Sequence, residues 1–332
     1  SLRHTPFALP TLRPRRAQRI DVSMSAKKVL IVGAGPAGLL AAHHLLLKGK
    51  PGAFDVTVAE RRADPRESMQ ASKRSYSLGL GVRGRSSIKD ASASLWELVK
   101  TRGVECERFS LHLGRRVLQI RQTSPQLISE PSVLINRADL CAALLDGFED
   151  QDIFTPKAQA PTLLFERQCI SVDCKEKVAV FQGPDSGLES VPYDVLLGAD
   201  GVNSAVRNAL LASEDAIRYA QAPLNGTLKT IHQKMPVPLD PLSVHAMSGV
   251  IPSQGDPSTT ATERLGLFWV PERNRTTGEL EACALVTWSP ESQPTSLLSA
   301  SSAVDAQVSP HTSFPTSFHR MPSVSFAVRL CW

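Results

Sequence analysis

The sequence lacks the residue patterns that usually carry metal binding or nucleophilic catalysis. Its six cysteines lie scattered over 332 residues, with no C-x-x-C pair and no Cys/His spacing typical of zinc. Scattered cysteines in such a chain are usually reduced thiols, so we assign them no chemistry and predict no metal site. A Ser/His/Asp or Cys/His constellation is equally missing, and no catalytic side chain is predicted.

The body of the chain also lacks an excess of either charge. The formal net charge is +5, from 37 basic and 32 acidic residues. Residues 1–19 hold five arginines and no acid, and without these arginines 32 basic residues face 32 acidic ones. This balance gives no electrostatic case for nucleic-acid binding. The arginine-rich start resembles a transit peptide for a mitochondrion or plastid; the alternative is a basic tail without an address, in a cytoplasmic protein.

No uninterrupted apolar run in the sequence is long enough to cross a membrane. The nearest is VLIVGAGPAGLLAAHHLLLKG at residues 29–49, whereas a span needs about 20 mostly apolar residues in one helix. Three glycines and a proline interrupt the run near its start, and two histidines lie near its middle. We therefore predict no transmembrane segment. The run reads instead as a short buried strand, a tight turn and a helix.

The turn in this run has the pattern G-x-G-x-x-G. Gly33 permits the sharp turn, Gly35 lets the backbone approach a diphosphate, and Gly38 allows close packing of the helix on the strand. Pro36, followed by Ala37, fits the first helical turn, where its missing N–H is not needed. The free N–H groups and the positive end of the helix dipole attract a diphosphate there.

A second strand, FDVTVAE, follows the helix and ends in Glu60. A carboxylate at this distance from the glycines, near the expected ~20 residues, can accept hydrogen bonds from a ribose. The strand, turn, helix and acid together predict a dinucleotide site, and they leave open which dinucleotide is bound.

The stretch YDVLLGADGVNSAVR, further along the chain, again combines a predicted strand with a glycine-containing turn. A predicted buried strand ends in a turn with Asp200 at its tip and Gly201 after it. An NAD-dependent dehydrogenase has no particular need for such a second site. A flavoenzyme that holds FAD while it meets NAD(P)H does need one. Arg207, in the same stretch, is predicted to be a structural partner of the turn.

Four blocks of the sequence, in order, resemble the FAD-dependent aromatic-ring hydroxylases, and among them the kynurenine hydroxylases. The blocks are VGAGPAGLLAA with AERR, then RSYSLGLGVRGRSSI, then LINRADLCAALL, and finally DVLLGADGVNSAVR, within residues 28–210. The second block is the distinctive one, since kynurenine hydroxylases carry a similar R-S-x-x-L-x-L-x-x-R-G. The resemblance implies an α/β chain: a Rossmann-type, glutathione-reductase-like FAD-binding fold (βαβ with a mixed sheet) and an interleaved, incomplete β-sheet substrate domain.

The resemblance also implies roles for individual residues. The glycine turn and Glu60 would hold the ADP half of FAD, with Arg61 beside the adenosine. Further cofactor contacts would come from Arg83, from Arg137 at a helix start, and from the Asp200–Gly201 turn. Arg108 falls near a family arginine that grips the carboxylate of the substrate; an exposed strand arginine is the competing interpretation.

The activity implied by the resemblance is hydroxylation of a small aromatic substrate. NADPH would reduce FAD, and the reduced flavin would capture O2 as a C4a-hydroperoxide that delivers one oxygen atom to the ring. Because the cofactor performs the difficult steps, no catalytic side-chain constellation is required.

One part of the family pattern is missing from this sequence. The family carries a G-D-A-x-H block in its C-terminal part, and residues 289–332 contain no Gly-Asp pair. The chain therefore reads as a truncated hydroxylase that would bind FAD weakly. Two alternatives stay open: a flavin-dependent reductase of the geranylgeranyl-reductase type, and an inactive FAD-binding fragment.

Composition and motifs divide the chain into four predicted parts. Residues 1–26 form the basic extension. Residues 27–212 form the FAD-binding domain, with part of the substrate sheet inserted at about 105–130. Residues 213–290 form a partial substrate domain. Residues 291–332, dominated by Ser, Thr and Pro, are predicted to be a disordered tail because they cannot bury much apolar surface.

Within these parts, sequence patterns predict individual elements. Residues 83–103 read as a loop leading into a helix. Residues 107–113 and 115–122 alternate as half-buried strands do. The segments 226–233, 264–272 and 281–289 are predicted to be strands of a second sheet.

Overall fold

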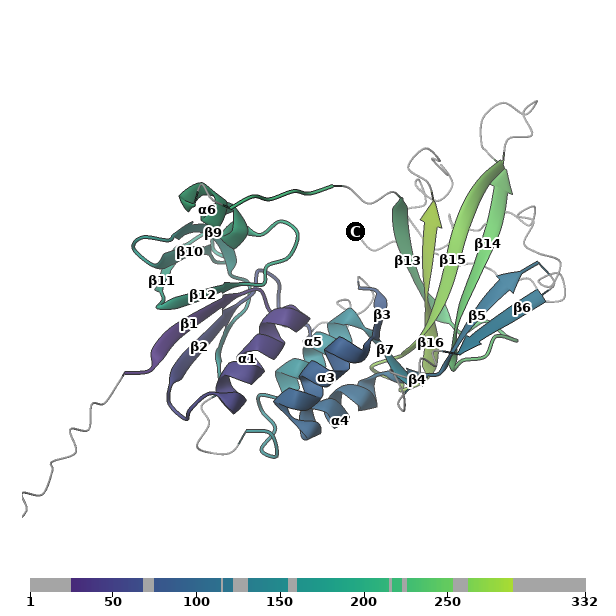
Figure 1. Ribbon diagram of the computed structural model, residues 1–332, viewed down its shortest axis with the longest axis horizontal. Helices are drawn as coiled ribbons and strands as arrows, with labels where there is room; N and C mark the ends of the chain where they lie inside the picture. The colour runs from purple at the N-terminus through teal and green to yellow at the C-terminus, as the bar shows by residue number, and fades with distance from the viewer. Residues whose placement is uncertain are drawn as a thin grey trace, which may run out of the picture.

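A computed structural model describes residues 25–67, 75–114, 116–121, 131–154, 160–214, 217–222, 226–252 and 262–288. The predicted disordered tail and nearly all of the basic extension lie outside these residues. Within the described part of the chain, the strands form four sheets (Figure 1). None of the helices in that part is both long and apolar enough to span a bilayer.

The first sheet is parallel and has the order β12-β1-β2-β8. Its strands are β1 (Lys27–Val32), β2 (Phe54–Ala59), β8 (Thr162–Leu164) and β12 (Val195–Gly198). Helices α1 (Pro36–Lys48), α3 (Val82–Ala91), α4 (Ala93–Arg102) and α5 (Arg137–Asp146) lie on one side of it. On the other side lies an antiparallel sheet of β9 (Gln168–Asp173), β10 (Val178–Gln182) and β11 (Leu188–Pro192).

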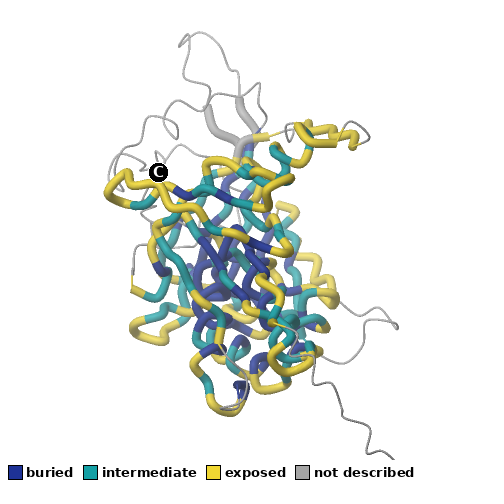
Figure 2. Tube along the Cα trace, turned by 90° about the vertical axis from the view of Figure 1, so that its left-hand side faces the viewer, coloured by how far each residue is buried: buried dark blue, intermediate teal, exposed yellow. Residues whose placement is uncertain are grey.

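The helices, the parallel sheet and the antiparallel sheet form three layers. The alternation of side chains along β1 explains this arrangement. Val29 and Ile31 point to the helices and pack in a cluster with Leu39 of α1. Leu30 and Val32 point to the opposite face and pack with Phe181 of β10. Because both faces of the strand are covered, VLIV is apolar throughout, as buried parallel strands are. The buried residues accordingly run through the middle of the molecule in Figure 2.

The largest sheet has six strands in the order β13-β16-β15-β14-β5-β6. They are β13 (Thr227–Lys234), β14 (Ser243–Pro252), β15 (Thr262–Arg273), β16 (Leu280–Trp288), β5 (Arg108–Leu113) and β6 (Arg116–Arg121). It is mixed, because β14 and β5 pair in parallel while the other neighbours are antiparallel. Strands β5 and β6, from the segment predicted as an insertion, thus lie beside the strands of residues 226–288. The division into domains stays a prediction.

A small antiparallel sheet joins the two larger parts. It has the order β3-β7-β4, from β3 (Ser77–Leu80), β7 (Ser132–Asn136) and β4 (Val104–Cys106). Strand β15 lies against β3, β7 and β4. The remaining helix, α6 (Ala205–Ser213), follows β12 and packs on β9.

Three details differ from the sequence predictions. Residues 82–91 form helix α3, not a loop, because Arg85, Ile88 and Ala91 recur on one buried face. Strand β12 was predicted to be buried, but it lies at the edge of its sheet and is half exposed. Strand β14 was not predicted at all, since its sequence SVHAMSGVIP mixes polar and apolar residues.

Candidate cofactor-binding site

The carboxyl ends of β1, β2 and β12 meet at one edge of the parallel sheet. Val32 lies opposite both Gly198 and Ala59, so the loops after these three strands open onto the same edge. A groove lies there, and the predicted residues that line it are Gly33, Gly35, Glu60, Arg61, Arg137, Asp200 and Gly201. The two distant motifs of the sequence therefore converge on one groove.

Two of the three glycines are required by close backbone contacts. Gly33 has φ +105° and donates its N–H to the carbonyl of Ala59 at 2.7 Å. A Cβ at Gly33 would collide with the carbonyl of Ala199, and a Cβ at Gly38 would collide with the carbonyl of Gly33. The turn is thus packed on the end of β12 and on the first turn of α1.

The middle glycine leaves open space in the groove. Among the described residues, a Cβ at Gly35 would meet only Nη2 of Arg137, at 3.3 Å. Helix α1 begins with Pro36 and Ala37, has no acidic residue in its first turn, and receives no side-chain cap from the described residues. Its free N–H groups and the Arg137 guanidinium therefore face the same space, an arrangement that fits the diphosphate of FAD.

Glu60 is held at the groove by two backbone donors. Its Oε2 accepts from the N–H of Ala34 at 3.0 Å, and its Oε1 accepts from the N–H of Arg62 at 3.1 Å. These bonds fix the carboxylate beside the glycine turn, where it can meet the hydroxyls of a ribose. Arg61 lines the groove next to it and is exposed.

The carboxylate of Asp200 is turned toward its own helix. It accepts from Ser204 Oγ at 2.5 Å and from the N–H of Ala205 at 2.7 Å, and so satisfies the start of α6. Asp200 and Gly201, which has φ +83°, still line the groove. Arg207 donates to the carbonyl of Val202 at 2.7 Å, which confirms its predicted role as a structural partner of the turn.

Five predicted residues do not line the groove. Three of them, Pro36, Ala37 and Gly38, form the first turn of α1, and the other two are Arg83 and Arg108. Arg83 is exposed in the first turn of α3. Arg108, on β5, forms an ion pair with Asp240 at 3.0 Å. Their roles toward the cofactor and the substrate stay predictions.

Sequence reasoning missed Arg167 and Cys169, which also line the groove. Arg167 follows β8, and its N–H donates to the carbonyl of Glu60 at 2.8 Å. Because β8 runs parallel to β2, the carboxyl end of β8 reaches the same edge of the sheet. This pairing is the signal that could have identified Arg167. Burial, with Asp200 nearby, raises the pKa of Cys169 to about 11, so this thiol stays protonated at neutral pH.

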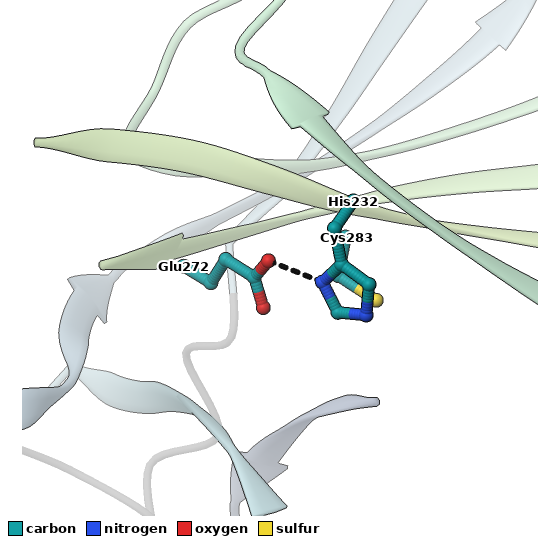
Figure 3. Close-up of side chains that lie close together, drawn as sticks. All are labelled: His232, Glu272 and Cys283. Carbon is teal, nitrogen blue, oxygen red and sulfur yellow. Dashed lines mark hydrogen bonds and ion pairs between the residues drawn. The ribbon is translucent and has the colours of Figure 1, made fainter. Parts of the chain in front are cut away.

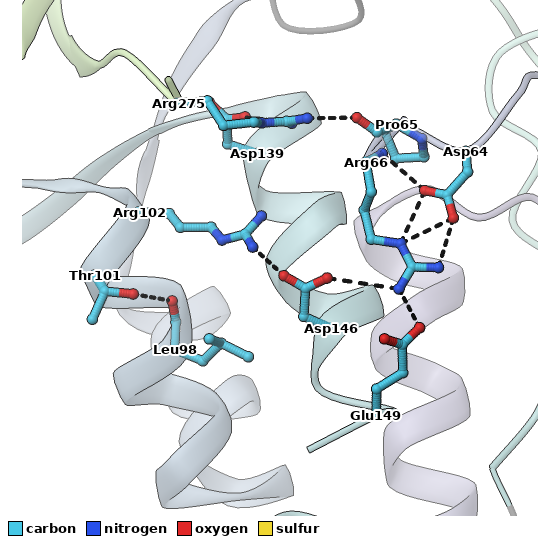
Figure 4. A network of polar contacts seen from close by, with 10 residues as sticks. All are labelled: Asp64, Pro65, Arg66, Leu98, Thr101, Arg102, Asp139, Asp146, Glu149 and Arg275. Atoms are coloured by element: carbon cyan, nitrogen blue, oxygen red, sulfur yellow. Dashed lines mark hydrogen bonds and ion pairs between the residues drawn. The ribbon is translucent and has the colours of Figure 1, made fainter. Parts of the chain in front are cut away.

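An ion-pair network fixes the loop that follows Glu60 (Figure 4). Arg66 bonds Asp64 at 2.6 Å, Glu149 at 2.5 Å and Asp146 at 3.6 Å. The hydrogen bonds that Arg66 donates to Asp64 raise the pKa of Arg66 further above its usual range. Asp146 also pairs with Arg102. The loop is thereby tied to the C-terminal end of α5 and, through Asp146, to α4.

Sequence comparison relates the chain to curated kynurenine 3-monooxygenases. It is 31% identical to the enzyme of Stenotrophomonas maltophilia over 198 residues, 57% of this chain and 38% of the relative. It is 30% identical to the enzyme of Phaeosphaeria nodorum over 195 residues, 56% of this chain and 38% of the relative. The chain thus matches well under half the length of these relatives. No protein-family model matches it.

Solved structures show the same fold at lower identity. The tetrameric form of 2-methyl-3-hydroxypyridine-5-carboxylic acid oxygenase matches with a TM-score of 0.57 and 15% identity, over 82% of this chain and 62% of that one. CmlS, a flavin-dependent halogenase, matches with a TM-score of 0.53 and 18% identity, over 79% of this chain and 42% of that one. The chain is thus similar in sequence to kynurenine 3-monooxygenases over somewhat more than half of its length, as the resemblance in its motifs predicted, and it shares the fold of these solved structures.

Proposed function

We propose that the chain binds FAD in the groove at the carboxyl ends of β1, β2 and β12. We further propose that it serves as the FAD-binding part of a monooxygenase that hydroxylates an aromatic substrate of the kynurenine type. The observation that carries this proposal is the convergence of the glycine turn and the Asp200–Gly201 turn on one groove, with Glu60 on the other side of the glycine turn. The sequence relationship to kynurenine 3-monooxygenases supports the choice of reaction.

Each part of the groove has a task in this proposal. The start of α1 and Arg137 hold the diphosphate, and the carboxylate of Glu60 accepts hydrogen bonds from the ribose. Arg61 lies beside the adenosine. Because the Asp200 carboxylate caps α6, the second turn meets the cofactor through the backbone of Asp200 and Gly201. Bound FAD supplies the activation of O2, and the protein supplies position and electrostatics.

The rest of the reaction rests on the family resemblance. NADPH as the reductant, the route of oxygen transfer and the substrate contact of Arg108 all stay predictions. Among the described residues, only the fold supports these three predictions. Arg108 itself already forms an ion pair with Asp240.

Cofactor binding is tested by titrating the purified chain with FAD and following the quenching of flavin fluorescence. Arg137→Ala should weaken binding at least about tenfold, because a charge-assisted contact to the diphosphate is lost. Arg116→Ala is the matched control, since Arg116 is exposed on β6 in the six-stranded sheet, and it should bind FAD as the unaltered chain does. Equal affinity for both variants would contradict the assignment of the groove.

Turnover is tested separately on the FAD-loaded chain. Oxygen consumption that needs both NADPH and kynurenine, with hydroxylated product in equal amount, is the expected result. Reduction of the flavin without oxygen transfer would instead favour the reductase alternative and leave the binding site intact.

A further inference from the structure

The register of three neighbouring strands places His232, Glu272 and Cys283 on one face of the six-stranded sheet. His232 of β13 lies directly opposite Cys283 of β16. Cys283 in turn lies opposite Val270 of β15, and Glu272 follows Val270 by two residues on the same face. Their ligand atoms lie within 4.8 Å of one another (Figure 3). The His232 and Glu272 side chains are 11% and 6% exposed, and Cys283 is fully buried.

The hydrogen bonds of His232 define which nitrogen faces the cluster. Nε2 lies 2.9 Å from the carbonyl of Ser75, and a carbonyl can only accept, so Nε2 carries a proton. Nδ1 lies 2.6 Å from Oε1 of Glu272. In a neutral imidazole this contact would oppose two lone pairs. A positive species must therefore lie between Nδ1 and Oε1, and both a proton and a metal ion meet that need.

Nδ1 of His232 and Oε1 of Glu272 face each other in the cluster, and the Cys283 thiol lies within hydrogen-bonding reach of Ser77. Oε2 of Glu272 accepts from Ser77 Oγ at 2.5 Å and from Asn136 Nδ2 at 3.3 Å, so Oε1 is turned to the cluster. Nε2 of His232 is fixed by a backbone carbonyl, as the second nitrogen of a metal-binding histidine commonly is. A proton shared between His232 and Glu272 needs no thiol, whereas a zinc ion would use Cys283 as its third ligand.

We propose that His232 Nδ1, Glu272 Oε1 and Cys283 Sγ form a zinc-binding site. Imidazole, carboxylate and thiolate are all zinc ligands, and the two anionic groups balance the charge of the ion in this buried place. Tetrahedral ligands lie about 3.3 Å apart, so the contact between Nδ1 and Oε1 opens by about 0.7 Å as zinc replaces the proton. The hydroxyl of Ser75, buried and without a hydrogen-bond partner among the described residues, lies on the residue whose carbonyl holds His232.

The ion would fasten β13, β15 and β16 to one another. Through Ser77 and Asn136, which hold Glu272, it would also fasten the small sheet of β3 and β7. The site shares no residue with the FAD groove, so this proposal stands independently of the proposed function.

Cobalt serves as the spectroscopic probe for zinc in the test. The full chain, stripped of metal with a chelator, is titrated with Co²⁺. One equivalent should bind and give a thiolate-to-cobalt absorption band, which Zn²⁺ then abolishes by displacement. Cys283→Ser should lose the band, whereas Cys106→Ser, which removes another buried cysteine outside the cluster, should keep it.

A second measurement keeps the proposal testable if Cys283→Ser does not fold. In the unaltered chain Zn²⁺ should raise the Tm, and His232→Gln should reduce zinc affinity at least about tenfold. Absence of the thiolate band in the unaltered chain would overturn the proposal, as would an unchanged band in Cys283→Ser.

Discussion

The FAD groove and the cluster around Glu272 differ in how far apart their polar partners lie along the chain. In the groove, Glu60 is bonded by the N–H of Arg62, two positions away, and by that of Ala34, 26 positions away. Asp200 is bonded by residues four and five positions away. In the cluster, the partners of Glu272 lie 40, 136 and 195 residues away, at His232, Asn136 and Ser77.

This difference separates two kinds of polar site. Contacts within a few residues need little more than the local turn, so they can form before the rest of the fold and contribute modestly to stability. Contacts over 40 to 195 residues exist only when the strands of two sheets have met. Because the cluster is buried, removing one partner leaves the others unpaired away from water.

Replacing the carboxylates of Glu272 and Asp200 tests this comparison most strongly. In the metal-free chain, Glu272→Gln should lower the free energy of unfolding by about 3 kcal/mol, because His232 loses its buried counter-charge. Asp200→Asn should cost less than about 1 kcal/mol, because the amide oxygen of asparagine can still accept hydrogen bonds at the start of α6. Urea unfolding followed by circular dichroism gives both values.

Glu279→Gln is the matched control for this pair, since Glu279 is exposed in the turn between β15 and β16. It should change the free energy of unfolding by less than about 0.5 kcal/mol. Equal losses for Glu272→Gln and Asp200→Asn would remove the distinction between local and distant partners.

The same distinction explains how much of the molecule could be predicted from its sequence. The strand, turn and helix around Gly33 were predicted because their signals lie within about 20 residues of one another. The convergence of Gly33 and Asp200 followed from a general rule, that the carboxyl ends of parallel strands share one edge. The same rule places Arg167 at this edge. Arg167 was missed because the sequence did not predict that the short strand β8 before it pairs with β2.

The cluster around Glu272 could not be predicted in this way. Its members are an ordinary histidine, glutamate and cysteine on three separate strands, and only the register of those strands places them together. Helix α3 was missed for a different reason. Its sequence VRGRSSIKDA is polar on average, and one of the three residues on its buried face is Arg85.

His43 tests whether a polar contact between helical residues far apart in the sequence also contributes to stability. It is fully buried, stacks on Phe148 with ring centroids 4.0 Å apart, and its Nε2 contacts the carbonyl of Leu144 at 2.7 Å. Burial lowers the pKa of His43 from 6.5 to about 4. The folded state thus keeps the ring neutral while the unfolded state gains a proton below pH 6.5, so stability falls as the pH drops from 6.5 toward 4.

Between pH 7 and pH 5 this residue should cost about 2 kcal/mol of unfolding free energy, at about 1.4 kcal/mol per pH unit. His43→Gln does not titrate and should flatten the pH dependence by that amount. His44→Gln is the neighbouring control, since it leaves His43 and its contact with Leu144 in place, and the pH dependence that His43 produces should persist in it. A slope that is the same in all three chains would contradict the assignment.

Arg275 offers the smallest effect and links the six-stranded sheet to helix α5 and to the loop after Glu60. It lies in the turn between β15 and β16, and its Nε donates to Asp139 of α5 at 2.6 Å, while Nη1 donates to the carbonyl of Pro65 at 2.6 Å (Figure 4). The Asp139 side chain is only 6% exposed. Because a glutamine amide can still donate to Asp139, Arg275→Gln should destabilise the chain by about 1.5 kcal/mol, the lower end for a hydrogen bond to a charged group.

The local consequence should exceed the global one. Because Pro65 lies in the loop after Glu60, amide hydrogen exchange in residues 61–67 should accelerate in Arg275→Gln more than exchange in β1 does. Arg273→Gln is the matched control, since Arg273 is exposed and, among the residues that the structure describes, bonds only to the carbonyl of Gly278 in the adjoining turn. Faster exchange in both variants would mean that the turn itself, and not the contacts of Arg275 with Asp139 and Pro65, holds the loop in place.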